Sequence, residues 1–380
     1  MTINFFTPIA VGWETTLACN MRCKHCGSIA GTKRDDELTT DEAIALCRQF
    51  DAFPQAHITL TGGETLVRKD WPQIVEELVR RRGACGVISN GWSIDRDTAK
   101  LLKQIQGERG RINIGLSLDG DEQRHDDLRA KPDSYRRVIE ALRNLRDNQI
   151  ATSIITCMHP GNVAVLDHVR DVALEYGAYA WQIQVTAEFG RAANNSGLIL
   201  QRGHYRTIAN KIAGYRRELR DSSLGVYTAD CVGYMGGLET SLRSCHWHGC
   251  HAGIRCLGIQ SNGNVKGCLS LLEDVFIEGN IRKKPVGEIW ADPTLFAYNR
   301  QFTPDQLTGV CATCKYGYAC RAGCHSTSYS MLGTVFEAPY CLYAEEQGRF
   351  DAPSAAPVSS MPALAGDVVP PREPEVVSLF

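Results

Sequence analysis

The chain has 380 residues, with 41 Lys and Arg against 43 Asp and Glu, so its formal net charge is −2. This length allows two domains, and the balanced charge argues against a protein that binds nucleic acid. No apolar run reaches the length of about 18 residues needed to cross a bilayer, and the N-terminus lacks the regions of a signal peptide, so we expect a cytoplasmic protein with no membrane contact.

Six apolar, β-branched runs of strand length alternate with helical segments in the first half of the chain. The runs are residues 10–17, 57–61, 85–89, 112–118, 150–157 and 179–185. The helical segments begin with a capping box on Thr39 and continue at residues 71–82, 97–105, 134–148 and 165–176. Such strand–helix units favour an α/β fold with a parallel sheet and helices outside it. Its chemistry is expected at the carboxyl ends of the strands.

The pattern changes after residue 190, and we divide the chain accordingly. Residues 1–203 form the predicted α/β domain, and residues 204–249 form a bridging helical segment with its helix near 204–220. Residues 250–345 form an irregular domain rich in Gly and Cys, which bound metal would stabilise. Residues 346–380 are expected to be a disordered tail, since residues 351–380 hold six of the 15 prolines.

Sixteen cysteines in a chain without a secretion signal indicate metal binding rather than disulfides. Cys19, Cys23 and Cys26 form a C-x3-C-x2-C loop directly after the first predicted strand. A [4Fe–4S] cluster normally takes four thiolates, so three would leave one iron open to a ligand. A zinc site and a structural thiol cluster are the alternatives. His25 is a candidate fourth zinc ligand, but it adjoins Cys26 and would strain to reach the same metal.

The cysteine loop after a first strand resembles the signature of radical S-adenosylmethionine (SAM) enzymes. The resemblance implies a partial (β/α)6 barrel, and it implies that Cys19, Cys23 and Cys26 hold a catalytic [4Fe–4S] cluster with SAM on its open iron. It further implies a reducing electron donor of the flavodoxin or ferredoxin type. SAM would be cleaved to a 5′-deoxyadenosyl radical that abstracts a hydrogen atom from the substrate.

Further motifs lie where this family places its SAM contacts, at the ends of the second, third and fourth strands. Residues 62–64 resemble the family's Gly-Gly-Glu, with Thr65 where the family most often has proline, and residues 89–91 resemble its Thr-Asn-Gly. An ordinary turn at residues 62–64 and a surface arginine at position 129 are the alternative interpretations. The residues that the resemblance assigns to SAM are Gly62, Gly63, Glu64, Ser89, Asn90, Ser117, Asp119 and Arg129.

The cysteines after residue 249 resemble those of the SPASM domain of radical SAM enzymes, which holds two auxiliary [4Fe–4S] clusters. The resemblance assigns Cys250, Cys256, Cys268 and Cys324 to the first cluster and Cys311, Cys314, Cys320 and Cys341 to the second. With the catalytic cluster, three clusters are expected. Cys245 is a further candidate for contact with the first auxiliary cluster or the substrate.

Enzymes with a SPASM domain mostly modify peptides or proteins, so the resemblance implies a ribosomally made precursor peptide as substrate. The reaction would form a cross-link or rearrange or excise part of the backbone. Sulfatase maturases of this family have an aspartate base where this chain has Leu269, and a leucine side chain cannot take a proton. The sequence after Gly267 is most similar to peptide maturases, and we suspect the subgroup that excises a tyrosine-derived unit.

Two other functions remain open at this stage. One is a radical SAM/SPASM enzyme acting on a small molecule or tetrapyrrole precursor. The other is a non-enzymatic iron–sulfur electron carrier, which would have no use for an open iron. Many peptide maturases have a domain of about 80 residues ahead of the barrel that binds the leader of the precursor peptide. Because the first strand begins near Ala10, we expect a separate leader-binding protein; the alternative is that the leader docks directly on the barrel or the SPASM region.

Overall fold

A single curved sheet of ten strands organises the computed structural model, which describes residues 6–350. The strand order is β10-β9-β8-β1-β2-β3-β4-β5-β6-β7, and β1 through β7 are all parallel. The strands are β1 Ala10–Thr16, β2 His57–Gly62, β3 Ala84–Ser89, β4 Arg111–Ser117, β5 Ala151–Met158, β6 Ala180–Val185, β7 Gly225–Thr228, β8 Cys256–Ile259, β9 Asn264–Lys266 and β10 Gly279–Asn280. The predicted α/β fold is therefore confirmed, and β1 to β6 lie within one residue of the predicted runs.

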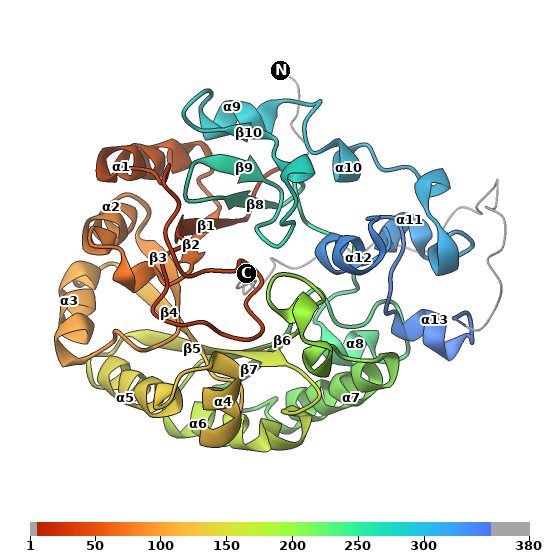
Figure 1. The fold of residues 1–380 in the computed structure, drawn as a ribbon, viewed down its shortest axis with the longest axis horizontal. Helices are drawn as coiled ribbons and strands as arrows, with labels where there is room; N and C mark the ends of the chain where they lie inside the picture. The colour runs from red at the N-terminus through yellow and green to blue at the C-terminus, as the bar shows by residue number, and fades with distance from the viewer. Residues whose placement is uncertain (1–5, 351–380) are drawn as a thin grey trace.

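Helices cover the outer face of this sheet, as a parallel sheet requires. Figure 1 shows α1, α2, α3, α5, α6 and α7 in an outer arc around the strands. The capping box predicted at Thr39 is present: Glu42 N donates to Thr39 Oγ1 at 3.3 Å, and Thr39 N donates to Glu42 Oε2 at 2.8 Å. The helices of the barrel are α1 Thr40–Gln49, α2 Trp71–Arg82, α3 Arg96–Gln106, α4 Glu122–Arg129, α5 Ser134–Asp147, α6 Leu166–Glu175 and α7 Arg202–Glu218.

The segment predicted as a helical bridge, residues 204–249, differs from that prediction. It contains α7, but also the parallel strand β7, which pairs with β6, and the short helix α8 Glu239–Leu242. The barrel sheet is thus one strand longer than predicted. The four-residue run of β7 is too short to give a clear periodic signal.

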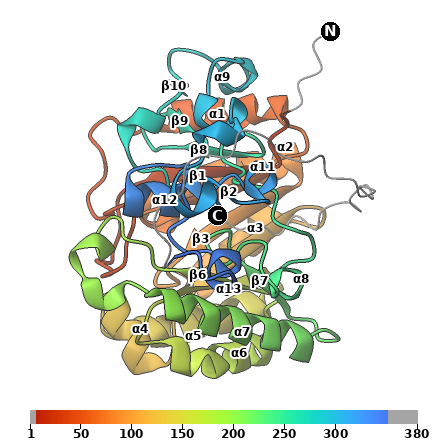
Figure 2. The same ribbon diagram turned by 90° about the vertical axis from the view of Figure 1, so that its right-hand side faces the viewer.

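The C-terminal region completes the sheet on its other edge. β8 pairs in parallel with β1, with Ala10 opposite Cys256, and β9 and β10 follow antiparallel. The remaining helices are α9 Val286–Ala291, α10 Ala297–Arg300, α11 Gly317–Cys320, α12 His325–Leu332 and α13 Leu342–Glu346. Helices α10 to α13 fill the side of the ring that the sheet leaves open (Figure 1), and Figure 2 shows α11, α12 and α13 on that side. The Cys-rich region therefore packs against the barrel and extends its sheet.

Among the described residues, no helix is both long enough and apolar enough to cross a membrane. The predicted tail lies outside the described residues from residue 351 onward. Its first residue, Glu346, ends α13, where its carboxylate accepts hydrogen bonds from Gly237 N at 3.0 Å and 3.2 Å.

Candidate functional site

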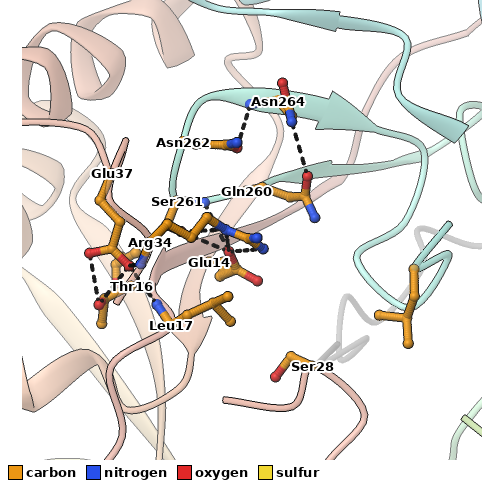
Figure 3. Close-up of polar contacts among 12 residues, drawn as sticks. Glu14, Thr16, Leu17, Ser28, Arg34, Glu37, Gln260, Ser261, Asn262 and Asn264 are labelled. Carbon is orange, nitrogen blue, oxygen red and sulfur yellow. Dashed lines mark hydrogen bonds and ion pairs between the residues drawn. The ribbon is translucent and has the colours of Figure 1, made fainter. Parts of the chain in front are cut away.

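The loop that bears Cys19, Cys23 and Cys26 leaves β1 and returns to it, closed at its base by polar contacts. Glu37 Oε1 accepts from Leu17 N at 2.7 Å and from Thr16 Oγ1 at 3.0 Å (Figure 3). Across the loop, Cys19 N donates to Gly31 O at 3.1 Å. These bonds fix both ends of a loop that has no regular secondary structure, so its three thiols keep a defined place at the end of β1.

Beside this closure, one carboxylate joins the barrel to the C-terminal region. Glu14 Oε1 on β1 accepts from Ser261 N at 3.0 Å, from Ser261 Oγ at 2.9 Å and from Arg34 Nη2 at 3.1 Å. Ser261 lies in the turn between β8 and β9, and Figure 3 shows Arg34 reaching toward both partners. The Cys loop and the β8–β9 hairpin are thereby held to the same strand.

The segment after β6 binds the cysteine loop through Arg191. The sequence analysis did not predict this contact. Arg191 N donates to Cys26 O at 3.0 Å, and Arg191 Nε donates to Cys23 O at 2.7 Å. Gly190 has φ +59°, and a Cβ there would lie 2.2 Å from Gly27 O, so this position requires glycine. The only sequence signal was a Gly-Arg pair following a predicted strand.

Residues 62–64 form the turn at the end of β2, beside the cysteine loop. Gly62 has φ +135°, and a Cβ on it would lie 2.3 Å from Thr16 O. Glu64 is buried, and its carboxylate accepts from Ser89 Oγ at 3.0 Å and from Asn90 N at 2.7 Å. Burial raises the pKa of Glu64, and these donors oppose the rise. The Glu64 carboxylate therefore ties the ends of β2 and β3 together.

Arg129, at the end of α4, forms the main charged contact beneath the loop. Its Nε and Nη2 each lie 2.7 Å from Asp119 Oδ2, and its Nη1 lies 3.9 Å from Cys23 Sγ. Burial acts to raise the pKa of Asp119, but the Arg129 guanidinium, together with two neighbouring histidines and the Cys157 N–H, outweighs burial and holds the pKa at about 2. Cys157 N donates to Asp119 Oδ1 at 2.9 Å, so both oxygens of Asp119 are used within the protein.

One cavity of about 450 Å³ joins these elements. Seven of the eight residues predicted to contact SAM line it, and Asp119 does not. Asp119 is buried behind Arg129, so we expect it to act by holding that arginine. The predicted SAM contacts that line the cavity are Gly62, Gly63, Glu64, Ser89, Asn90, Ser117 and Arg129.

The same cavity reaches the C-terminal cysteines. Two predicted ligand sets line it: Cys19, Cys23 and Cys26 from the barrel, and Cys250, Cys256, Cys268 and Cys324 from the C-terminal region. The other set, Cys311, Cys314, Cys320 and Cys341, lines a separate, smaller pocket. Cys245 is exposed and lies in neither lining. The structure thus places seven of the eleven predicted ligands around one cavity and the other four around a second pocket.

The donor sets fit iron–sulfur clusters. All sixteen cysteines are free thiols. Among the described residues, no three His, Cys, Asp or Glu side chains are arranged to hold a single metal ion. A cubic cluster binds each thiolate through a different iron, so its ligands surround a volume instead of meeting at one point, whereas zinc ligands converge on one ion. Three thiols at the end of a cavity lined with glycine and polar groups also suit a cluster with an open iron and a bound SAM.

Comparison with known proteins identifies two domains. The radical SAM superfamily model matches residues 13–172, and the iron–sulfur cluster-binding SPASM model matches residues 250–315. The chain is 28% identical over 347 residues to an AdoMet-dependent heme synthase of Nitratidesulfovibrio vulgaris, covering 88% of this chain and 92% of that protein. It is 27% identical over 327 residues to mycofactocin maturase MftC of Mycobacterium ulcerans, covering 85% of this chain and 84% of that protein.

A solved structure shares the fold. Streptococcus suis SuiB bound to S-adenosylmethionine superposes with a TM-score of 0.70 at 16% identity, covering 89% of this chain and 77% of SuiB. SuiB bound to its precursor peptide SuiA gives a TM-score of 0.69 at 15% identity, covering 89% of this chain and 76% of SuiB. At these identities the likeness concerns the fold alone.

Proposed function

This chain is a radical SAM enzyme with a SPASM iron–sulfur domain, and we propose that it modifies a ribosomally synthesised precursor peptide. Its cofactors are [4Fe–4S] clusters and SAM, which together supply a hydrogen-abstracting radical. An electron carrier without enzymatic activity is therefore no longer an alternative. We assign the catalytic cluster to Cys19, Cys23 and Cys26, and the auxiliary clusters to the two four-cysteine sets given above.

The charge of the cavity lining carries the proposal of a peptide substrate. Both arginines of the lining already have partners within the protein. Arg129 is paired with Asp119, and Arg191 donates to carbonyl groups of the cysteine loop. The rest of the lining has thiol, imidazole, hydroxyl, amide and apolar side chains and three carboxylates, those of Glu14, Glu64 and Asp230. A buried carboxylate needs a cation or several donors. This lining therefore suits a neutral peptide segment better than a molecule with several carboxylates.

Comparison with relatives supports a peptide and also gives the second candidate. MftC is named a maturase, and SuiB was solved with a precursor peptide. The relatives named AdoMet-dependent heme synthase cover as much of this chain at similar identity, which favours a tetrapyrrole precursor equally on sequence alone. The decision for a peptide rests on the cavity lining, which offers carboxylates and two arginines that are already paired, and so does not suit a substrate with several carboxylates.

Two partners follow from the proposal. A reduced flavodoxin or ferredoxin would supply the electron that SAM cleavage consumes. A separate protein would present the leader of the precursor, because ordering a flexible peptide costs conformational entropy that a second binding site offsets. We place the reaction in the reducing cytoplasm, where the sixteen free thiols are stable.

Anaerobic co-expression with short peptide genes adjacent to its own gene tests the substrate. Mass spectrometry should show a peptide whose mass changes only when Cys19, Cys23 and Cys26 are intact. Loss of a hydrogen pair would indicate a cross-link, and loss of a tyrosine-derived unit would indicate excision. An unchanged peptide pool, together with conversion of a tetrapyrrole precursor by the purified enzyme, would reject the peptide and establish the tetrapyrrole.

A further inference from the structure

Three buried polar atoms in the cavity lining have no hydrogen-bond partner among the described residues: His25 Nδ1 in the cysteine loop, Gln182 Oε1 and Thr327 Oγ1. Gln182 is 4% exposed and Thr327 is 3% exposed. Neither Gln182 Oε1 nor Thr327 Oγ1 has a partner, and both residues belong to the cavity lining. A buried polar atom left unpaired costs about 1–3 kcal/mol, so each of these atoms favours a ligand that bonds to it.

The positions of the two residues separate them from the predicted SAM contacts. Gln182 lies on β6 opposite Tyr227 of β7 in the strand register, while the predicted SAM contacts lie at or just after the ends of β2, β3 and β4 or on α4. Thr327 lies in the first turn of α12, in the C-terminal region that fills the open side of the ring. Apart from His25 in the cysteine loop, the cavity thus has one unpaired group from each domain, outside the part that the SAM motifs occupy.

We propose that Gln182 and Thr327 bind main-chain amide groups of the substrate peptide, an inference that rests on the peptide substrate proposed above. The Gln182 side chain presents an acceptor oxygen and a donor NH₂ group, which is complementary to the C=O and N–H of a peptide unit. The Thr327 hydroxyl can donate to a carbonyl or accept from an N–H. Both side chains recognise backbone, so they would hold the peptide in the cavity independently of its sequence.

The neighbouring lining supports a neutral ligand at these two groups. Gln184 and Thr186 follow Gln182 along the same edge of the barrel, and Ser326 precedes Thr327. All of these side chains are uncharged, and each can donate or accept a hydrogen bond. A peptide backbone, in which hydrogen-bond donors and acceptors alternate, is complementary to this part of the cavity lining.

Binding without turnover provides the test. The reconstituted holoenzyme is held anaerobically with S-adenosylhomocysteine in place of SAM, and the fluorescein-labelled precursor peptide from the co-expression is titrated by anisotropy. Gln182→Leu and Thr327→Val should each raise the Kd for the peptide about tenfold. The control is Thr59→Val, because the Thr59 hydroxyl is also buried and unpartnered but lies outside the cavity lining. It should leave the Kd unchanged.

A modified peptide identifies the bonded group. Replacing one main-chain amide by an ester removes a single N–H donor. One such ester should bind the wild-type enzyme more weakly than the unmodified peptide does. The Gln182→Leu variant should bind this ester and the unmodified peptide equally tightly, because the variant already lacks the side chain that accepts from the N–H. The iron content of every variant shows whether the fold is preserved.

The outcomes separate this inference from the proposed function. A wild-type enzyme that neither binds nor modifies the peptide overturns both. A wild-type enzyme that binds it, with unchanged Kd in Gln182→Leu and Thr327→Val, overturns only the amide-binding role. Weaker binding of S-adenosylhomocysteine with unchanged peptide binding would assign the two residues to the nucleoside and would also overturn that role.

Discussion

Arg129 Nε donates to Asp119 Oδ2 at 2.7 Å, and Arg129 Nη2 forms an ion pair with the same oxygen, also at 2.7 Å. The Asp119 carboxylate is fully buried, and the Arg129 side chain is 10% exposed. A buried ion pair of this kind is stable only as a pair, because removing one partner leaves an uncompensated charge in a medium of low dielectric constant. The pair lies directly under the Cys23 thiol, so it affects both folding and the catalytic loop.

Asp119→Ala should reduce the free energy of unfolding by about 3–5 kcal/mol. Asp127→Ala is the control, since Asp127 pairs with Lys24 at an exposed site and should cost at most about 1 kcal/mol. The pKa of Asp119, about 2, lies below its unfolded value. The contribution of Asp119 is therefore complete at pH 7 and is lost as the pH falls toward 2. Urea denaturation at pH 7 measures both variants, and equal losses would contradict the buried pair.

The triple variant Cys19→Ala, Cys23→Ala, Cys26→Ala should retain about 8 of about 12 irons per chain after anaerobic reconstitution, because only one of three four-iron clusters is removed. It should also produce no 5′-deoxyadenosine from SAM. Iron assay and chromatography of the nucleoside products test this. Continued formation of 5′-deoxyadenosine would show that the radical arises elsewhere.

Cys256→Ala should lose about four irons per chain, whereas Cys245→Ala should keep them all. Cys256 is buried and lines the cavity with Cys250, Cys268 and Cys324, while Cys245 is exposed outside it. Both variants remove one thiol, so a difference in iron content between them depends only on where that thiol lies. A loss confined to Cys245→Ala would reverse the ligand assignment.

Sequence patterns within a few residues predicted the barrel strands and the helix cap, because neighbouring residues determine these features. The six barrel strands are continuous apolar runs, and the box at Thr39 and Glu42 is closed by residues three apart. The spacing of Cys19, Cys23 and Cys26 likewise predicted one ligand set, and the family resemblance predicted the two auxiliary sets; all three assignments stay predictions. These features could be read without knowing the tertiary contacts.

Contacts between distant residues could not be predicted in this way. Arg191 reaches Cys23 across 168 positions, and Ser261 reaches Glu14 across 247. Strands β7 to β10 have two to four residues each and are stabilised by the sheet edges that they join. Asp119 was predicted to contact SAM, but its buried pairing with Arg129 depends on where α4 returns, and the sequence analysis did not predict α4.

Gly190→Ala should disrupt the catalytic cluster specifically. The left-handed backbone, φ +59°, strains any residue with a Cβ by about 1 kcal/mol, but here the added Cβ would also lie 2.2 Å from Gly27 O and 2.4 Å from Cys26 O. Backbone atoms cannot move aside as a flexible side chain can, so the loop that bears Cys26 must shift. We expect loss of about four irons and of SAM cleavage.

Gly177→Ala is the matched control for this prediction. Gly177 has the same left-handed backbone, with φ +70°, and a Cβ there would meet nothing within 4 Å. It should therefore incur the backbone strain alone, with a slightly lower thermal unfolding midpoint and unchanged iron content and SAM cleavage. Because both variants carry the same strain, the difference between them isolates the contact with the cysteine loop. If the two variants retained equal iron, the segment after β6 would have no part in holding the loop.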